Sequence, residues 1–383
     1  MSQSSPTRSF REKLDKKGQR KLLACDGGGI RGIISIEILA NIEKELRASS
    51  GNPDLVLADY FDYVAGTSTG AIIATLVSLG KSVDEIRKFY VKSGAQMFQP
   101  AKLWERLHTK FDEDELSKML KDILGAETTL GSDKLQTLLM VVLRNATTDS
   151  PWPLSNNPDA KYNRRSEAKK KSNLDLPLWQ LVRASTAAPV YFPPETIQID
   201  ETLRFIFVDG GITMYNDPAF QLFLMATVEP YNLRWETGRE KMLLVSVGTG
   251  ASADANSKLS PRQMNLLYNA SHIPSALMAS ALHEQDFLCR VFGDCLAGGP
   301  LDREIGDMIG KGIPSLSKLF TYVRYNADLS RSGLDDLGLA KINPEHVQQM
   351  DSVEHIGEMQ EVGKAVADKR VSGTHFRAFP AKS

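Results

Sequence analysis

Apolar residues fall into two patterns along the chain: short continuous runs, and longer stretches with helical spacing. The first run, residues 21–25, is typical of a strand buried in a parallel sheet. It leads into a glycine-rich segment, residues 26–32. An amphipathic helix is predicted next, with an apolar face made of Ile33, Ile34, Ile36, Ile38, Leu39, Ile42 and Leu46. The pattern therefore predicts a strand, a glycine loop and a helix in succession.

Similar patterns predict elements along the rest of the chain. Further strands are expected over residues 60–65, 135–143, 205–208, 243–250 and 321–325. Further helices are expected over residues 71–79, 84–93, 112–124, 178–185 and 260–289. Near the C-terminus, Asn343 is a suitable N-cap and Pro344 a suitable first helical residue, and another helix is predicted over residues 353–369.

The ends of the chain differ in character from its middle. Residues 1–19 are polar and contain no apolar run, so we expect a flexible tail and not a secretory signal. No stretch has the composition of a linker. Residues 20–335 are therefore predicted to form one domain, with residues 336–383 as a helical extension packed on it.

A long segment in the middle, residues 144–176, is predicted to be irregular because it contains several prolines. It carries a basic run, which is either a solvated loop or a patch for anionic lipid headgroups. We favour the solvated loop, because the run does not fall on a predicted amphipathic helix. The basic residues are Lys161, Arg164, Arg165, Lys169, Lys170 and Lys171.

Composition narrows the class of protein. The chain has 383 residues, 42% of them hydrophobic, as expected for a globular protein with a sizeable core. Lys and Arg number 46 against 47 Asp and Glu, which argues against a nucleic-acid binder that works by bulk charge. Cys25, Cys289 and Cys295 form no C-x-x-C pair, so we expect buried, reduced thiols in a cytosolic protein. No apolar run approaches the length of a membrane span.

The segment Gly66-Thr67-Ser68-Thr69-Gly70 has the G-x-S-x-G pattern of a nucleophile elbow. It lies between a predicted strand and a predicted helix, the context that an elbow needs. A serine on such a turn is lifted clear of the sheet, and the glycines relieve crowding around it. Ser68 is therefore a candidate nucleophile, although the pentapeptide alone fits a glycine-bracketed turn with a helix cap equally well.

The glycine loop allows two functional interpretations. Gly27, Gly29 and Gly32 match the dinucleotide fingerprint G-x-G-x-x-G. The acidic residue expected about 20 positions later falls at Asp54, after the helix and not at a strand end. Alternatively, the backbone N–H groups of Gly27, Gly28 and Gly29, with Arg31 beside them, would form an oxyanion hole at a helix N-terminus. We rank the oxyanion hole first and nucleotide binding second.

A third motif, Asp209-Gly210-Gly211, follows the predicted strand over residues 205–208. An acid at the carboxyl end of a buried strand lies where open α/β sheets keep their ligand sites. On its own, however, the motif is more simply an Asp-Gly turn.

Together the three motifs resemble the patatin-like phospholipase family. That family carries D-G-G-G-x-[KR]-G, G-x-S-x-G and D-G-[AG] in this order, matched here at residues 26–32, 66–70 and 209–211. Residues 184–189 and the strand over 243–250 are also similar to family patterns. The resemblance covers residues 20 to about 335.

The resemblance implies a three-layer α/β/α sandwich around a central, largely parallel sheet. It also implies a serine lipid acyl hydrolase with Ser68 as nucleophile and Asp209 as proton acceptor. Gly27, Gly28, Gly29 and Arg31 would form the oxyanion hole. The supporting glycines would be Gly32, Gly66, Gly70, Gly210 and Gly211. The implied substrates are acyl esters of phospholipids or lysophospholipids, and no metal or cofactor is required.

The sequence also suggests expectations about localisation, partners, activation and catalytic competence. We expect a cytoplasmic protein that contacts membrane surfaces during turnover and binds no nucleic acid. Some bacterial patatin-like proteins are effectors switched on by cyclic nucleotides in antiphage defence, and this chain resembles them in size, so a cyclic-nucleotide activator is a hypothesis. A catalytically dead storage or interaction protein is the remaining alternative. Five histidines follow Asp209 and could supply a triad, but none lies in a comparable turn, so we favour a Ser-Asp dyad.

Overall fold

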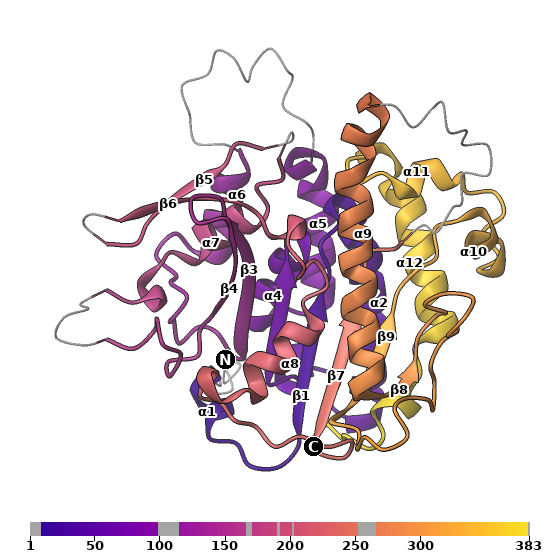
Figure 1. Ribbon diagram of the computed structural model, residues 1–383, viewed down its shortest axis with the longest axis horizontal. Helices are drawn as coiled ribbons and strands as arrows, with labels where there is room; N and C mark the ends of the chain where they lie inside the picture. The colour runs from indigo at the N-terminus through magenta and orange to yellow at the C-terminus, as the bar shows by residue number, and fades with distance from the viewer. Residues whose placement is uncertain are drawn as a thin grey trace.

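Nine strands form one mixed sheet in the described part of this computed structural model (Figure 1). The structure describes residues 9–98, 115–165, 171–189, 192–200, 203–251 and 266–381, apart from the side chains of residues 95, 96, 98 and 266–275. The strands are β1 (Arg20–Cys25), β2 (Tyr63–Thr67), β3 (Leu138–Asn145), β4 (Ser150–Ser155), β5 (Glu195–Gln198), β6 (Arg204–Asp209), β7 (Met242–Val247), β8 (Gly293–Ala297) and β9 (Phe320–Tyr325).

Six of these strands run parallel, in the spatial order β3-β2-β1-β7-β9-β8. Strand β6 extends the sheet antiparallel to β3, and β5 pairs with β6. The register aligns Cys25 at the end of β1 with Gly66 of β2 and with Val247 of β7. The segments that follow these three strands therefore meet at one edge of the sheet.

Helices cover both faces of the sheet. They are α1 (Phe10–Leu14), α2 (Gly32–Ser50), α3 (Leu57–Tyr60), α4 (Thr69–Ser78), α5 (Val83–Phe98), α6 (Glu115–Leu124), α7 (Leu178–Ser185), α8 (Ala219–Thr227), α9 (Leu266–Phe292), α10 (Arg331–Asp336), α11 (Pro344–Gln348) and α12 (Ile356–Arg370). Helices α2, α4, α5 and α12 pack on one side, and α8 and α9 on the other (Figure 1). The predicted α/β/α architecture with a largely parallel sheet is confirmed.

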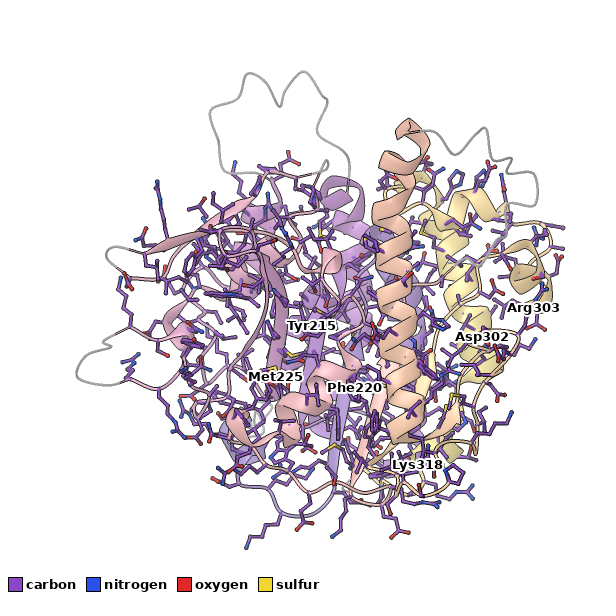
Figure 2. The ribbon with its side chains drawn as sticks, viewed as in Figure 1. Tyr215, Phe220, Met225, Asp302, Arg303 and Lys318 are labelled. Carbon is purple, nitrogen blue, oxygen red and sulfur yellow. The ribbon has the colours of Figure 1, made fainter. Side chains whose placement is uncertain are left out.

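The core lies between the sheet and these helices. Every residue of β1, β2, β7 and β9 is buried, as expected for strands covered on both faces. On the α8 side, the ring of Phe220 stacks on Phe292 at 5.6 Å between centroids. Figure 2 shows Phe220 and Met225 on α8 close to the middle of the molecule.

Residues 9–14 do not form the flexible tail that their polarity suggested. Ser9 caps α1 by accepting a hydrogen bond from the N–H of Arg11, and Phe10 is fully buried. The amine of Lys13 donates to the carbonyls of Ala58 and Phe61, both at 2.7 Å. One buried ring and one lysine with backbone acceptors are enough to fix this polar segment on the domain.

Residues 144–176 are less irregular than predicted. Strand β4 pairs antiparallel with β3 over residues 150–155, although it contains Pro151 and Pro153. Proline is tolerated there because β4 pairs with β3 alone among the described strands, and an edge strand needs fewer backbone N–H donors than a central one. In the basic run, Arg164 and Arg165 form ion pairs with Asp159 and Asp175, and Lys169 and Lys170 lie outside the described residues.

The C-terminal helix α12 packs along α2. Its residues Met359, Val362 and Val366 are fully buried. The two helices approach closely at Gly363, where a Cβ atom would lie 2.7 Å from the Cβ of Glu37. Residues 336–381 therefore share the core of the main domain.

Two further expectations concern the thiols and the membrane. Cys25, Cys289 and Cys295 are all buried and unpaired. Among the described residues, no helix combines the length and the apolar composition needed to cross a bilayer.

Candidate active site

Ser68 lies on a sharp turn between β2 and α4. Its backbone has φ 53° and ψ −126°, a conformation that is strained for a residue with a Cβ atom. The two flanking glycines have no space for a side chain. A Cβ on Gly66 would lie 2.0 Å from the carbonyl oxygen of Gly70, and one on Gly70 would lie 2.2 Å from that of Cys25. The turn therefore has the geometry of a nucleophile elbow.

Asp209 is the hydrogen-bond partner of Ser68. The Ser68 hydroxyl donates to Oδ2 of Asp209 at 2.6 Å, and both side chains are buried. The other carboxylate oxygen, Oδ1, accepts the N–H of Gly211 at 2.6 Å. Burial raises the pKa of the Asp209 carboxyl to about 6, although hydrogen bonds from Ser68 and Gly211 and the charge of Arg183 oppose this shift. The raised pKa makes Asp209 a stronger base than an exposed aspartate.

Ser185 holds the backbone of Ser68 in place. Its hydroxyl accepts the N–H of Ser68 at 2.9 Å and donates to the carbonyl of Val142 at 2.6 Å. Ser185 ends α7, and the carbonyl of Ala187 just beyond it accepts the N–H of Asp209 at 2.9 Å. One short segment therefore contacts both partners of the Ser68–Asp209 pair. The sequence placed residues 184–189 in a family pattern but gave no role to Ser185.

Three side chains hold the carbonyl groups of the glycine loop. Thr249 donates to the carbonyl of Gly27 at 2.9 Å, and Tyr90 donates to that of Gly29 at 2.7 Å. Arg31 contacts the carbonyl of Gly28 at 3.5 Å. In a trans peptide the N–H of the next residue points away from the carbonyl. The contacts of Thr249 and Arg31 therefore fix the directions of the N–H groups of Gly28 and Gly29, neither of which binds a described residue, and that of Tyr90 fixes the N–H of Ile30.

Two members of the predicted oxyanion hole have other partners. The N–H of Gly27 donates to the carbonyl of Asn216 at 3.1 Å, so it is not free to bind a ligand. The guanidinium of Arg31 donates to the carbonyl of Gln348 at 3.1 Å in addition to its contact with Gly28. Arg31 therefore orients the loop through its backbone. Gly28 and Gly29 have N–H groups without a described partner, whereas two donors of the Arg31 guanidinium are used by backbone carbonyls.

The family model for patatin-like phospholipases matches residues 23–223, just over half of the chain.

The chain belongs to the patatin-like phospholipase family.

Plant patatins are among its relatives. Patatin-17 of Solanum cardiophyllum is 33% identical over 251 residues, which are 61% of this chain and 61% of the relative. Patatin group J-1 of Solanum tuberosum is 30% identical over 249 residues, with the same coverage of 61% and 61%. The chain thus spans about three fifths of the length of the curated patatins that it matches.

Two solved structures are similar at low identity. Human GIVD cytosolic phospholipase A2 in complex with methyl gamma-linolenyl fluorophosphonate aligns at 10% identity with a TM-score of 0.41, covering 94% of this chain and 60% of that one. VipD from Legionella pneumophila aligns at 14% identity with a TM-score of 0.37, covering 92% and 67%. Likenesses of this size say nothing about the chemistry of this chain.

In this patatin-like protein, Asn216 packs between the first and third motifs. Its side-chain oxygen would lie 2.3 Å from a Cβ on Gly27 and 3.0 Å from one on Gly211. A side chain at position 27 would therefore clash with Asn216, and one at position 211 would be tightly packed against it, independently of any ligand. A Cβ on Gly210 would lie 2.2 Å from the carbonyl oxygen of Val142, so the first glycine of the D-G-G motif has no space for a side chain.

A buried ion cluster lies at the base of the glycine loop. Arg324 of β9 binds both carboxylate oxygens of Asp26, at 2.9 and 2.6 Å, and it approaches Asp217 at 3.2 Å. The hydroxyl of Ser246 accepts from Arg324 at 2.6 Å. Burial raises the pKa of Asp26 above its usual range, and the Arg324 charge opposes this shift. Asp26, the first residue of the D-G-G-G motif, follows β1 and is thus bound to β9, which is separated from β1 by β7 in the sheet.

No described histidine side chain contacts Ser68 or Asp209. Nδ1 of His375 lies 2.7 Å from the hydroxyl of Tyr325, and His283 is exposed on α9. His346 and His355 contact Glu358. The side chain of His272 and all of His108 lie outside the described residues.

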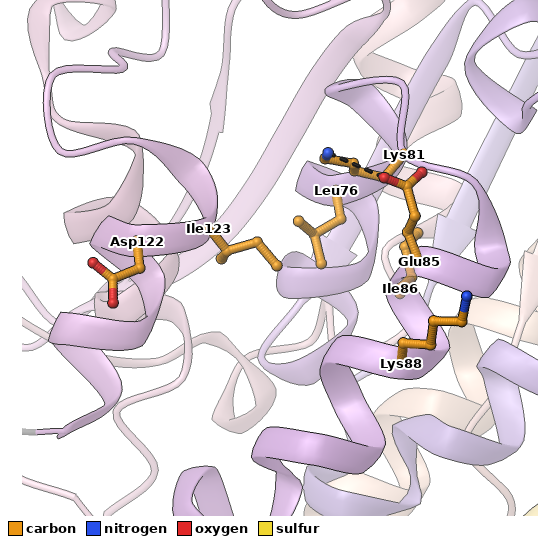
Figure 3. Close-up of a pocket in the computed structure, with 7 residues that line it drawn as sticks. All are labelled: Leu76, Lys81, Glu85, Ile86, Lys88, Asp122 and Ile123. Carbon is orange, nitrogen blue, oxygen red and sulfur yellow. Dashed lines mark hydrogen bonds and ion pairs between the residues drawn. The ribbon is translucent and has the colours of Figure 1, made fainter.

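A surface cavity of about 370 Å³ lies at the far end of α4 from Ser68 (Figure 3). Its lining comes from α4, α5, α6 and the α4–α5 connection, and consists of Leu76, Lys81, Glu85, Ile86, Lys88, Asp122 and Ile123. Lys81 and Glu85 pair with each other at 3.2 Å. The cavity contributes no group to the Ser68–Asp209 pair.

Proposed function

We propose that this protein is a lipid acyl hydrolase that uses Ser68 and Asp209 as a catalytic dyad. The observation that carries the proposal is the 2.6 Å hydrogen bond from the Ser68 hydroxyl to a buried carboxylate whose pKa is raised. An adjacent base is what a serine needs in order to act as a nucleophile. Membership of the patatin-like phospholipase family supports carboxylic esters of phospholipids or lysophospholipids as substrates.

The dyad would act in two steps. Ser68 Oγ attacks the acyl carbonyl while its proton passes to Asp209, and the N–H groups of Gly28 and Gly29 stabilise the oxyanion. Asp209 then protonates the leaving lysolipid or glycerol oxygen, which leaves an acyl-enzyme. A water molecule gives its proton to Asp209 and attacks the acyl carbon. The bond from that carbon to Ser68 Oγ then breaks, Asp209 returns the proton to Ser68, and the fatty acid is released.

Two measurements on the full chain test this proposal. A fluorophosphonate probe should label Ser68, as identified by peptide mass spectrometry, because activated serines attack phosphorus in the same way. Mass spectrometry of phospholipid vesicles should detect released fatty acid. If Ser68 stays unlabelled and no fatty acid appears from phospholipid or lysophospholipid, the chain is instead a catalytically inactive member of the family.

The activity should rise with pH through the pKa of Asp209. A general base must be deprotonated, and the pKa of Asp209 is raised to about 6 by burial. Below pH 6 the carboxyl is protonated and kcat/KM should fall about tenfold per pH unit; above it, kcat/KM should be flat. The measurement is a profile of kcat/KM on a soluble monomeric ester. A profile that is flat from pH 4.5 to 8 would exclude Asp209 as the base.

Contact with a lipid surface should depend on the loop after Asp209. Ile212 and Met214 expose 39% and 46% of their surface directly beyond the D-G-G motif. Burying one such side chain in lipid is worth about 1 kcal/mol, so Met214→Ser should lower kcat/KM on phospholipid vesicles about fivefold. The double variant with Ile212→Ser should lose more.

Two controls make this test specific. Turnover of a monomeric ester should be unchanged in Met214→Ser. Ile313→Ser removes an equally exposed side chain, 47%, from the loop before β9 and should leave vesicle hydrolysis unchanged. Equal losses on vesicles for Met214→Ser and Ile313→Ser would remove the role of this loop in membrane contact.

A further inference from the structure

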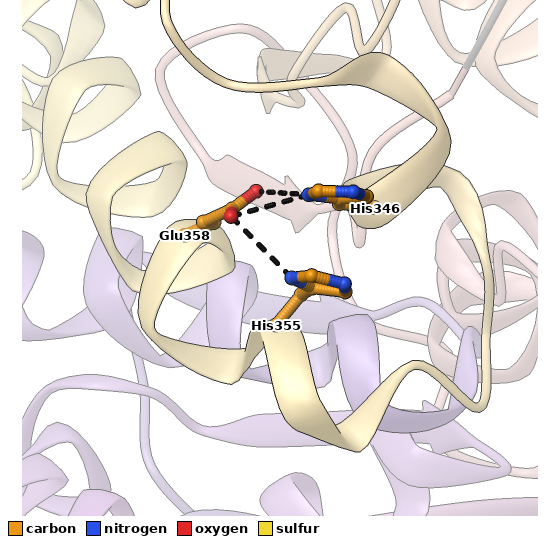
Figure 4. Close-up of side chains that lie close together, drawn as sticks. All are labelled: His346, His355 and Glu358. Carbon is orange, nitrogen blue, oxygen red and sulfur yellow. Dashed lines mark hydrogen bonds and ion pairs between the residues drawn. The ribbon is translucent and has the colours of Figure 1, made fainter.

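His346, His355 and Glu358 form a cluster outside the catalytic site (Figure 4). His346 lies in α11, His355 ends the short helix η6 (Val353–His355), and Glu358 is in the first turn of α12. Nδ1 of His346 lies 3.0 Å from Oε2 of Glu358, and Nδ1 of His355 lies 3.3 Å from Oε1. The two imidazole rings are stacked, with 3.6 Å between their centroids. Both rings therefore direct the same nitrogen toward one carboxylate.

These distances suit a transition-metal ion. With bond lengths of 2.0–2.1 Å, the ligand atoms of a tetrahedral zinc ion are about 3.3 Å apart. Measured to the single oxygen Oε1 of Glu358, Nδ1 of His346 lies at 3.2 Å and Nδ1 of His355 at 3.3 Å, which matches this spacing. One ligand atom from each residue can be chosen so that all three lie within 4.8 Å of one another. Two imidazoles and a carboxylate are ligands for Zn²⁺, whereas Mg²⁺ and Ca²⁺ prefer oxygen ligands alone.

The cluster is accessible to an ion from solvent. The side chains of His346, His355 and Glu358 are 36%, 26% and 33% exposed. An ion bound by three protein ligands would keep one position for water. The small movement needed is a splaying of the stacked rings, which part-exposed side chains can make without a change in the core.

The segment between the two histidines contacts the glycine loop of the catalytic site. The carbonyl of Met350 accepts the N–H of Ile30 at 2.9 Å, and the carbonyl of Gln348 accepts from Arg31. The same Met350 carbonyl lies 2.2 Å from where a Cβ on Gly29 would be. Residues 346–355 are thus directly packed on the backbone that carries the Gly28 and Gly29 donors.

We propose that His346, His355 and Glu358 bind a zinc-class divalent cation, which ties α11 to α12 and fastens the intervening segment on the glycine loop. The cation is a structural ligand and takes no part in ester chemistry. The proposal is independent of the proposed hydrolase function, because binding and local stability are measured without substrate.

Isothermal titration of the full, untagged chain with Zn²⁺ tests the site. After removal of metals with a chelator, the wild type should bind one Zn²⁺ per chain at neutral pH, and Mg²⁺ or Ca²⁺ should give no comparable heat. His346→Ala and His355→Ala should each weaken binding by about tenfold or more, since even partners of metal ligands contribute 10–100-fold. His283→Ala removes an exposed histidine from α9 and is the matched control. The site would be overturned if the wild type bound no Zn²⁺, or if His346→Ala and His355→Ala bound Zn²⁺ with the affinity of the wild type.

Hydrogen exchange tests the effect on the segment. Zn²⁺ should slow amide exchange in peptides covering residues 346–358 and 27–31 of the wild type, and it should have no effect in His355→Ala. Binding that leaves exchange in residues 27–31 unchanged would overturn the connection to the glycine loop.

Discussion

Replacing Ser68 by glycine should abolish ester hydrolysis and still give a more stable protein than replacing it by alanine. Both variants remove the hydroxyl and its hydrogen bond to Asp209, so both should lose about 10⁴-fold or more in kcat. They differ in backbone freedom. At φ 53° and ψ −126° a Cβ atom costs about 1–3 kcal/mol, whereas glycine costs about 0.5–1 kcal/mol of unfolded-state entropy. Ser68→Gly should therefore exceed Ser68→Ala in stability by about 1 kcal/mol.

The measurement is the thermal transition of the two variants, with fatty-acid release as the activity readout. Ser35 offers a matched pair, because it is also a buried serine whose hydroxyl donates one hydrogen bond, to the carbonyl of Gly248 at 2.7 Å. Ser35 lies inside α2, where glycine is less favourable than alanine by about 1 kcal/mol. The order of stability should therefore reverse at position 35. Equal order at both positions would show that the turn at Ser68 stores no strain.

The sheet was predictable because most of its strands have local patterns, and the pairing of Ser68 with Asp209 was implied by the resemblance of the three motifs to one family. Short runs rich in apolar, β-branched or aromatic residues identified β1, β3, β7 and β9 to within a few residues. Each glycine motif follows a strand in the sequence, so the candidate residues could be assigned to strand ends. The register of a largely parallel sheet then brings the ends of β1 and β2 to one edge. No such pattern marks β4, because its two prolines are untypical of a strand.

The support of the site could not be predicted, because it depends on contacts between distant segments. Nothing near Asp26 in the sequence indicates Arg324, which lies 298 residues away and binds the Asp26 carboxylate through both of its terminal nitrogens, Nη1 and Nη2. The neighbours of Gly27 in the sequence suggested a place in the oxyanion hole. Its N–H instead donates to the backbone carbonyl of Asn216, in the loop after β6. A glycine motif predicts a close approach of backbone. It does not reveal which N–H groups remain available.

The histidines illustrate the same limit. His355 and Glu358 have helical i,i+3 spacing, but an irregular segment separates them from His346, so helical spacing gives no sign that the side chain of His346 meets theirs. Phe10 is a comparable case, since a single buried ring within a polar stretch fixes residues that composition assigned to a tail. In both cases one or two tertiary contacts outweigh the local pattern.

Replacing Asp209 by asparagine should reduce kcat by about 10³-fold or more, whereas replacing any histidine after it should not. Asparagine keeps the size of the side chain but cannot accept the proton of Ser68. The fold should be retained, because the side-chain carbonyl of asparagine can still accept the N–H of Gly211 that now binds Oδ1. Loss of a well-placed general base typically costs 10²–10⁴-fold. The measurement is kcat on a monomeric ester at pH 7.5, where Asp209 of the wild type is deprotonated.

The histidine variants decide between a dyad and a triad. Alanine at His272, His283, His346, His355 or His375 should leave most of the activity, since none of the four whose side chains are described contacts Ser68 or Asp209. His272 is the informative member, because its side chain lies outside the described residues. One folded histidine variant that loses 10³-fold in kcat, together with an Asp209→Asn variant that loses less than tenfold, would replace the dyad with a histidine base. The pH profile separates the two mechanisms further: Asp209→Asn should lack the rise near pH 6 that the wild type shows, and every histidine variant should keep it.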